Sequence, residues 1–166
     1  KEVLRYRNAI LWADRELKRF PLSNRIILGV FERLMPEYDG GYRRAQNQIT
    51  NSIERTPVYT PPSADRIPEL ISNWEKYVHE SDEDVDPLMR CIVCHYQFEA
   101  IHPFNDGNGR TGRILMILQL MNYGLLSKPI LFVSAHILAK KDEYYRVLLG
   151  VTEKGSWREY ISFMLT

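Results

Sequence analysis

Apolar residues recur every three to four positions along most of the chain, which is the spacing of one face of an α-helix. The segment EVLRYRNAILWADREL at residues 2–17 places a stripe of apolar side chains toward a core, namely Val3, Tyr6, Ile10, Ala13 and Leu17. The same spacing predicts further helices over residues 22–35, 65–80, 87–101, 110–124, 142–151 and 157–165. Gly124 is the expected C-terminal cap of the helix over 110–124.

The pattern changes over residues 37–64, which are rich in Gly, Asn, Thr and Pro. Two short extended candidates lie there, QNQIT at residues 46–50 and TPVYT at residues 56–60. They predict a loop or a small β-hairpin. Signals for other strands are almost absent, so we expect an all-α fold with one small hairpin, in which residues 1–166 form a single domain.

Composition narrows the class of partner. The 166 residues carry a formal net charge of +1, which gives no large field to attract nucleic acid or an anionic membrane. No apolar run approaches the length of a membrane span. Basic pairs such as Arg43–Arg44 are expected on the solvated surface. The sequence begins with Lys1 rather than Met, so we expect a fragment of a longer protein.

The two cysteines admit two interpretations. Cys91, Cys94 and His95 form Cys-x-x-Cys-His, the string of c-type haem attachment. The same residues continue a helical stripe with Leu88, Phe98 and Ile101. We favour core packing, because small buried cysteines suit a helix face and no export signal is visible. Reduced thiols fit a cytoplasmic protein.

The string GNGRTG at residues 107–112 fits G-x-G-x-x-G, the dinucleotide-binding fingerprint. That fingerprint follows a β-strand within a βαβ unit and needs an acidic residue about 20 positions later. Here the preceding segment is helical and no acidic residue stands at the expected place. An EF-hand is excluded as well, because Ile117 stands where its final Glu is required.

The wider segment HPFNDGNGRTGR at residues 102–113 predicts a helix, a loop and a second helix. Gly107 and Gly109 allow a ligand to approach the backbone closely. The first N–H groups of the second helix, together with its dipole, form an anion site. Arg110 and Arg113 lie three positions apart on one face of that helix, so both can bind phosphate oxygens. Two guanidinium groups fit a polyphosphate better than a single phosphate.

Three other residues of the segment complete the chemistry. A carboxylate beside phosphates, here Asp106, is a ligand for Mg²⁺. The imidazole of His102 can accept a proton near neutral pH. Phe104 alternates with these two residues and is expected to turn inward as an anchor. The set serves the transfer of a phosphorus-containing group, in which positioning and charge stabilisation dominate catalysis.

The segment resembles the signature of Fic-domain proteins, H-x-F-x-[DE]-G-N-G-R-x-x-R, and matches every fixed position. The similarity extends to GGYRRAQNQI, YTPPS and DEYYRVL, and so covers essentially the whole chain. It implies an all-α Fic domain with a hairpin flap. It also implies an enzyme, a protein adenylyltransferase that moves AMP from ATP to a Tyr, Thr or Ser hydroxyl of a target protein and releases pyrophosphate.

The resemblance also implies roles for individual residues. His102 would be the general base and Asp106 the Mg²⁺ ligand. The remaining nucleotide-binding positions of the signature would be Gly107, Asn108, Gly109, Arg110, Thr111, Gly112 and Arg113, with the glycines and Asn108 forming the anion hole. The flap would comprise Asn47, Gln48, Ile49 and Thr50, and the target protein would dock near residues 46–50 as an added strand. Tyr144 and Tyr145 would approach the nucleoside.

One family feature is missing from the sequence. Many Fic proteins are inhibited by a helix with [ST]-x-x-x-E-[GN], and Thr50 with Glu54 has only the first spacing, because Arg55 follows. In similar chains that helix precedes EVLRYRNAI. We therefore expect an inhibitory helix upstream in cis, or in trans. Alternative functions are a Fic-type kinase, transfer of another nucleotide or phosphodiester group, and a nucleotide-binding module without chemistry; Gly109 and Arg113 favour AMP transfer over the kinase.

Overall fold

The computed structural model describes residues 1–50, 57–80, 84–129 and 133–166. They fall into two compact units, Lys1–Pro129 and Ile130–Thr166, and each unit is described by itself. Within the described residues, no helix is long and apolar enough to cross a membrane.

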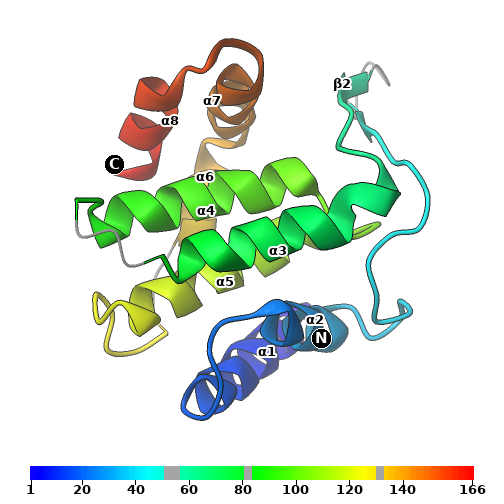
Figure 1. Ribbon diagram of the computed structural model, residues 1–166, viewed down its shortest axis with the longest axis vertical. Helices are drawn as coiled ribbons and strands as arrows, with labels where there is room; N and C mark the ends of the chain where they lie inside the picture. Colours follow the sequence, from blue (N-terminus) through cyan, green and yellow to red (C-terminus); the bar gives the residue numbers. More distant parts are fainter. Residues whose placement is uncertain (51–56, 81–83, 130–132) are drawn as a thin grey trace. The chain divides into compact units, whose positions relative to one another are not determined.

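The first unit contains five α-helices among its described residues, together with one short hairpin (Figure 1). α1 packs against α2, α3 packs against α4, and α5 contacts α1, α2 and α4. The bounds are α1 Glu2–Leu17, α2 Asn24–Leu34, β1 Ile49–Thr50, β2 Pro57–Tyr59, a 3₁₀ turn Ala64–Arg66, α3 Ile67–Val78, α4 Pro87–Ile101 and α5 Asn108–Asn122.

The second unit is a cluster of three described helices, α6 Val133–Ala139, α7 Lys141–Lys154 and α8 Trp157–Met164. α7 packs against both of the others. Tyr144 of α7 is buried and contacts Phe163 of α8, with ring centroids 5.9 Å apart. α7 ends at Gly155, which has φ 65° and so adopts the left-handed conformation that glycine tolerates.

Local sequence explains where α4 begins and ends. The Asp86 carboxylate caps its first turn by accepting hydrogen bonds from the backbone N–H groups of Leu88 at 2.8 Å and Met89 at 3.3 Å. Pro87 stands at the first position, where its missing N–H costs nothing. The helix ends where His102 turns into the left-handed region. Both ends are therefore fixed before the site begins.

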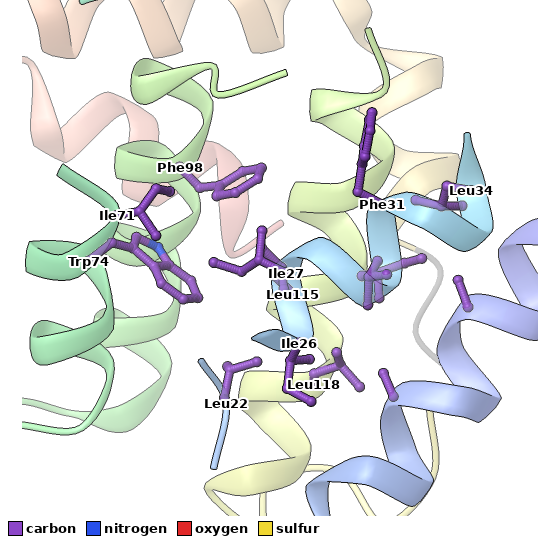
Figure 2. Packing of buried hydrophobic residues seen from close by; sticks show 14 of the residues in the cluster. Leu22, Ile26, Ile27, Phe31, Leu34, Ile71, Trp74, Phe98, Leu115 and Leu118 are labelled. Carbon is purple, nitrogen blue, oxygen red and sulfur yellow. The ribbon is translucent and has the colours of Figure 1, made fainter. Parts of the chain in front are cut away.

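The core of the first unit is formed by apolar side chains of α1 to α5 (Figure 2). Trp74 of α3 is its largest fully buried side chain, and its indole Nε1 donates to the Cys94 carbonyl of α4 at 2.9 Å. Gly29 lets α1 and α2 approach closely, because a Cβ there would lie 2.0 Å from the Trp12 ring. The core therefore holds α4 and α5, which carry the candidate site, against the other helices.

The structure confirms the all-α class and the hairpin, and it places helices in all seven segments where periodicity predicts them. The helix α6 is an addition, because the sequence analysis predicted no helix there. Cys91 and Cys94 are buried, as core packing requires. Three burial predictions are wrong: Val3 and Leu88 are 81% and 36% exposed, and Arg43, expected on the surface, is 3% exposed.

Candidate active site

His102 stands between α4 and the loop that leads to α5. Its φ of 49° is positive, the one such value among described non-glycine residues. A side chain in this region costs on the order of 1–3 kcal/mol and persists only where surrounding contacts hold it. Its N–H donates to the Phe98 carbonyl at 3.1 Å, and its own carbonyl accepts from Arg43 Nε at 2.9 Å. The turn that presents the imidazole is therefore fixed from both sides.

Phe104 anchors the loop, as the sequence analysis predicted. Its side chain is 0% exposed, and its ring stacks on Phe31 of α2 at a centroid distance of 3.7 Å and an interplanar angle of 2°. Tyr42 and Phe98 complete the aromatic surroundings at 5.2 and 6.5 Å. Since a buried aromatic ring contributes several kcal/mol, the loop is tied to the core at its centre.

Asn108 shapes the loop through its side chain. Its Oδ1 accepts from the Phe104 N–H and its Nδ2 donates to the Phe104 carbonyl, both at 2.8 Å. Next to it, Gly107 has φ 79° and lies so close to α2 that a Cβ would be 2.9 Å from Met35 Cγ. The amide thus holds the loop together, while the backbone N–H of Asn108, the first residue of α5, has no partner within the helix and can bind an anion.

The first turn of α5 brings cationic groups and free backbone donors together. The initial N–H groups of a helix have no partner within it. Arg110 lies beside Asp106, with Nη2 3.6 Å from Oδ2, and its Nη1 pairs with Glu2 of α1. A Cβ on Gly109 would lie 3.0 Å from Arg113 Nη1, so the Arg113 guanidinium lies over the helix start. Both arginines are therefore placed where an anion would bind.

Two buried titratable groups of α4 flank Arg113. Glu99 is 7% exposed, and its Oε1 has no hydrogen-bond partner among the described residues. Burial raises the pKa of Glu99 to about 7, while Arg113 lowers it. Burial also lowers the pKa of His95 to about 4, and Arg113 acts in the same direction. Helical periodicity predicts His95 in the core but assigns no role to Glu99, because it shows which residues are buried and not which charges they face.

The electrostatics of His102 favour the neutral imidazole. Burial has the largest effect on the His102 pKa and lowers it, and the Arg43 guanidinium lowers it further. The Glu99 backbone carbonyl and the Asp106 carboxylate raise the His102 pKa, with the Glu99 carbonyl the stronger of these two. A histidine with a lowered pKa is neutral at physiological pH, which is the form that accepts a proton.

Asp106 fits a role as a ligand of one divalent cation. Its side chain is 58% exposed, and Oδ1 accepts from the Gly107 N–H at 2.6 Å, which orients the carboxylate. The described residues contain no group of three or more side chains that could hold a metal by themselves. One carboxylate joined by phosphate oxygens and waters is the ligand set that Mg²⁺ prefers.

The predicted flap is an antiparallel hairpin, in which Ile49 of β1 pairs with Tyr59 of β2. Its base is tied to the site by hydrogen bonds from Asn47 Nδ2 to the Phe104 carbonyl at 3.4 Å and from Tyr59 Oη to the Ala100 carbonyl at 2.7 Å. Gln48 and Thr50 are exposed. The hairpin thus places an exposed strand segment next to the loop; Glu54 and Arg55 lie outside the described residues.

Four further predicted residues are not among these groups. Thr111 and Gly112 face the interior, and a Cβ on Gly112 would lie 2.4 Å from Glu99 Oε1, which favours packing over ligand contact. Tyr144 and Tyr145 belong to the second unit, where Tyr144 is buried and Tyr145 is 46% exposed. Their position at a nucleoside stays a prediction.

Comparison with known families shows which family the segment from His102 to Arg113 belongs to. The model of the Fic/DOC family matches residues 21–120, which include all of α2, the hairpin, α3, α4, the loop and most of α5. The match covers more than half of the chain, and it includes every residue of the signature from His102 to Arg113.

Curated relatives carry a common description. A probable protein adenylyltransferase of Aquifex aeolicus is 34% identical over 117 residues, covering 68% of this chain and 34% of the relative. The protein adenylyltransferase Fic of Culex quinquefasciatus is 30% identical over 166 residues, covering 98% of this chain and 30% of the relative. The chain therefore spans about a third of the length of these relatives.

Solved structures agree with this similarity. A Fic family protein of Desulfovibrio desulfuricans superimposes with a TM-score of 0.73 at 34% identity, over 84% of this chain and 42% of that one. Fic-1 of C. elegans, residues 134–508, gives a TM-score of 0.75 at 26% identity, over 98% of this chain and 46% of that one.

Proposed function

The chain belongs to the Fic/DOC family, and on this premise we propose that it is a protein adenylyltransferase. It would transfer AMP from ATP to a hydroxyl group of a target protein. One observation carries the proposal: a partly buried imidazole, whose pKa burial lowers, and two arginines at the start of α5 flank one short loop. The names of the relatives supply the chemistry that this loop is proposed to perform.

The proposed reaction needs three contributions from the protein. His102 accepts the proton of the attacking hydroxyl, whose oxygen forms a bond to the α-phosphorus as the bond to the β-phosphate oxygen breaks. The N–H groups at the start of α5 bind the negative charge of the phosphates, and Arg110 and Arg113 hold the outer phosphates that leave as pyrophosphate. Asp106 would hold a Mg²⁺ ion, which supplies charge neutralisation to the phosphates.

The target is proposed to dock at β1, because the exposed strand segment at residues 48–50 can pair with an extended peptide. An inhibitory helix, upstream in cis or in trans, also stays part of the proposal. The proposal also includes a single Fic domain over residues 1–166, which the Fic-1 match over 98% of the chain supports. It includes a cytoplasmic location as well, which we expect from the two free thiols.

Isotope-labelled ATP tests the proposal. The protein is incubated with Mg²⁺ and a cell lysate, once with ATP labelled on the α-phosphate and once with ATP labelled on the γ-phosphate. We expect protein-bound label from the α-phosphate only, and none with the His102→Ala variant. Label from the γ-phosphate would show a kinase instead. ATP binding without transfer of either label would favour a binding module or another donor.

A further inference from the structure

The Arg43 side chain lies in a ring of backbone carbonyl groups. It donates from Nε to His102 at 2.9 Å, from Nη1 to Ala45 at 3.1 Å, and from Nη2 to Pro62 at 2.5 Å and Ile101 at 3.5 Å. The side chain is 3% exposed. Because a guanidinium has five donors in a planar fork, one group satisfies carbonyls that approach from different directions.

These carbonyls come from three separate segments. Ala45 precedes β1, and Pro62 follows β2, so both strands of the hairpin are held where they leave it. Ile101 and His102 end α4, and the Arg43 backbone N–H adds a bond to the Pro103 carbonyl at 2.9 Å. One residue therefore joins both ends of the flap to the backbone that presents the imidazole.

The charge of Arg43 is satisfied without a carboxylate. The ion pairs found among the described residues include none with Arg43. Burial of a charged group costs several kcal/mol unless hydrogen bonds compensate, and here neutral carbonyls provide them. An arginine that only filled space would be replaceable by an apolar residue; this one retains a charge whose field reaches His102.

We propose that Arg43 is a positioning residue for the reaction, which fixes the left-handed turn at His102 and holds the flap in register with it. The inference rests on the proposed role of His102 as the base. Movement of the flap and placement of the base are then coupled, so a target strand bound at β1 and the imidazole that accepts its proton share one support.

Two variants separate this role from simple stabilisation. Arg43→Met removes the charge and all side-chain donors with an unbranched chain, whereas Arg43→Lys keeps the charge but offers one point of donation instead of a fork. Arg44→Met is the matched control, because Arg44 is adjacent and exposed. All are compared at a temperature where each is folded, as judged by circular dichroism.

We expect kcat to fall by about tenfold or more in both Arg43 variants, since small misplacements of a catalytic group cost rates of this order. The KM for ATP should change less than the KM for the target. Arg43, Asp106 and the Glu99 carbonyl are the groups that act on His102, and Arg43 lowers its pKa. The acidic limb of the kcat profile should therefore move to higher pH in Arg43→Met and stay in place in Arg43→Lys.

An NMR titration of His102 in the same variants needs no substrate and is therefore independent of the proposed reaction. A higher His102 pKa in Arg43→Met than in Arg43→Lys supports the inference even if the wild-type protein transfers nothing. Wild-type kcat and target KM in Arg43→Lys, or an unmoved His102 pKa in Arg43→Met, would overturn it. If Arg43→Met does not fold, the Arg43→Lys kinetics alone decide.

Discussion

The Asn108 side chain holds the backbone of Phe104 from both sides, so Asn108→Ala removes two hydrogen bonds of 2.8 Å inside the protein. The Phe104 N–H loses its partner, and an unpaired buried donor costs about 1–3 kcal/mol. The Phe104 carbonyl keeps a weaker bond to Asn47 Nδ2 at 3.4 Å, which reduces its share. We expect the free energy of unfolding to fall by about 2–4 kcal/mol in total.

Urea denaturation measures this loss directly, and for a chain of this size it corresponds to a drop in Tm of roughly 5–15 °C. Asn105→Ala is the matched control, because Asn105 is exposed in the same loop. Asn108→Asp should be at least as destabilising, since one carboxylate oxygen would face the Phe104 carbonyl. A loss below about 0.5 kcal/mol for Asn108→Ala, the level of an ordinary surface change, would show that these hydrogen bonds do not stabilise the loop.

Three further outcomes follow from other contacts. The pKa of Glu99 is about 7 in the fold and 4.5 ordinarily, so the folded protein binds this proton more tightly than the unfolded chain does. Glu99 therefore contributes its full stabilisation at low pH, and this contribution is lost as the pH rises toward and through 7. Urea melts of Glu99→Gln should therefore show no decline in the free energy of unfolding over this pH range. A decline equal to that of the wild-type protein would contradict the role of Glu99. Gly112→Ala should lower the free energy of unfolding by about 1–3 kcal/mol in urea melts, because the new Cβ would lie 2.4 Å from Glu99 Oε1. Adding Glu99→Ala should restore part of that loss, and no restoration would show that another contact is responsible. Glu2→Gln releases Arg110 and should tighten ATP binding two- to fivefold, roughly the contribution of an exposed ion pair, as measured by calorimetry. Glu37→Gln is the control, because Glu37 pairs with Arg5 instead. An equal effect in both variants would show that the change is nonspecific.

Periodicity predicted most of the helices well because they bury one continuous face, whereas α5 is buried on all sides over residues 114–120, a largely apolar run. α4 occupies the segment expected for it, residues 87–101, since its cap and its left-handed end are both local. The wrong burial predictions arise where contacts with other helices determine whether a side chain is buried. Val3 and Leu88 lie on apolar stripes but in the first turns of their helices, and spacing along one helix does not show how far its partners reach. α6 is a short helix of seven residues, with little periodicity to read.

The site divides in the same way. The segment from His102 to Arg113 could be predicted, because its chemistry lies within twelve consecutive residues. The support for His102 could not, since Arg43 acts from 59 positions away and a basic pair ordinarily predicts a solvated surface. The environment of Arg113 also depends on tertiary contacts, because Glu99 and His95 approach it from another helix.

The decisive measurement for the proposed roles of His102 and Arg113 separates ATP binding from label transfer in single-residue variants. His102→Ala and Arg113→Ala would each be measured by calorimetry with ATP and Mg²⁺ and by transfer of label from the α-phosphate. We expect His102→Ala to bind ATP as the wild-type protein does and to transfer no label, whereas Arg113→Ala should bind ATP more weakly. Label transfer that persists in His102→Ala would contradict the assignment of the base, and with it the proposed reaction at this loop.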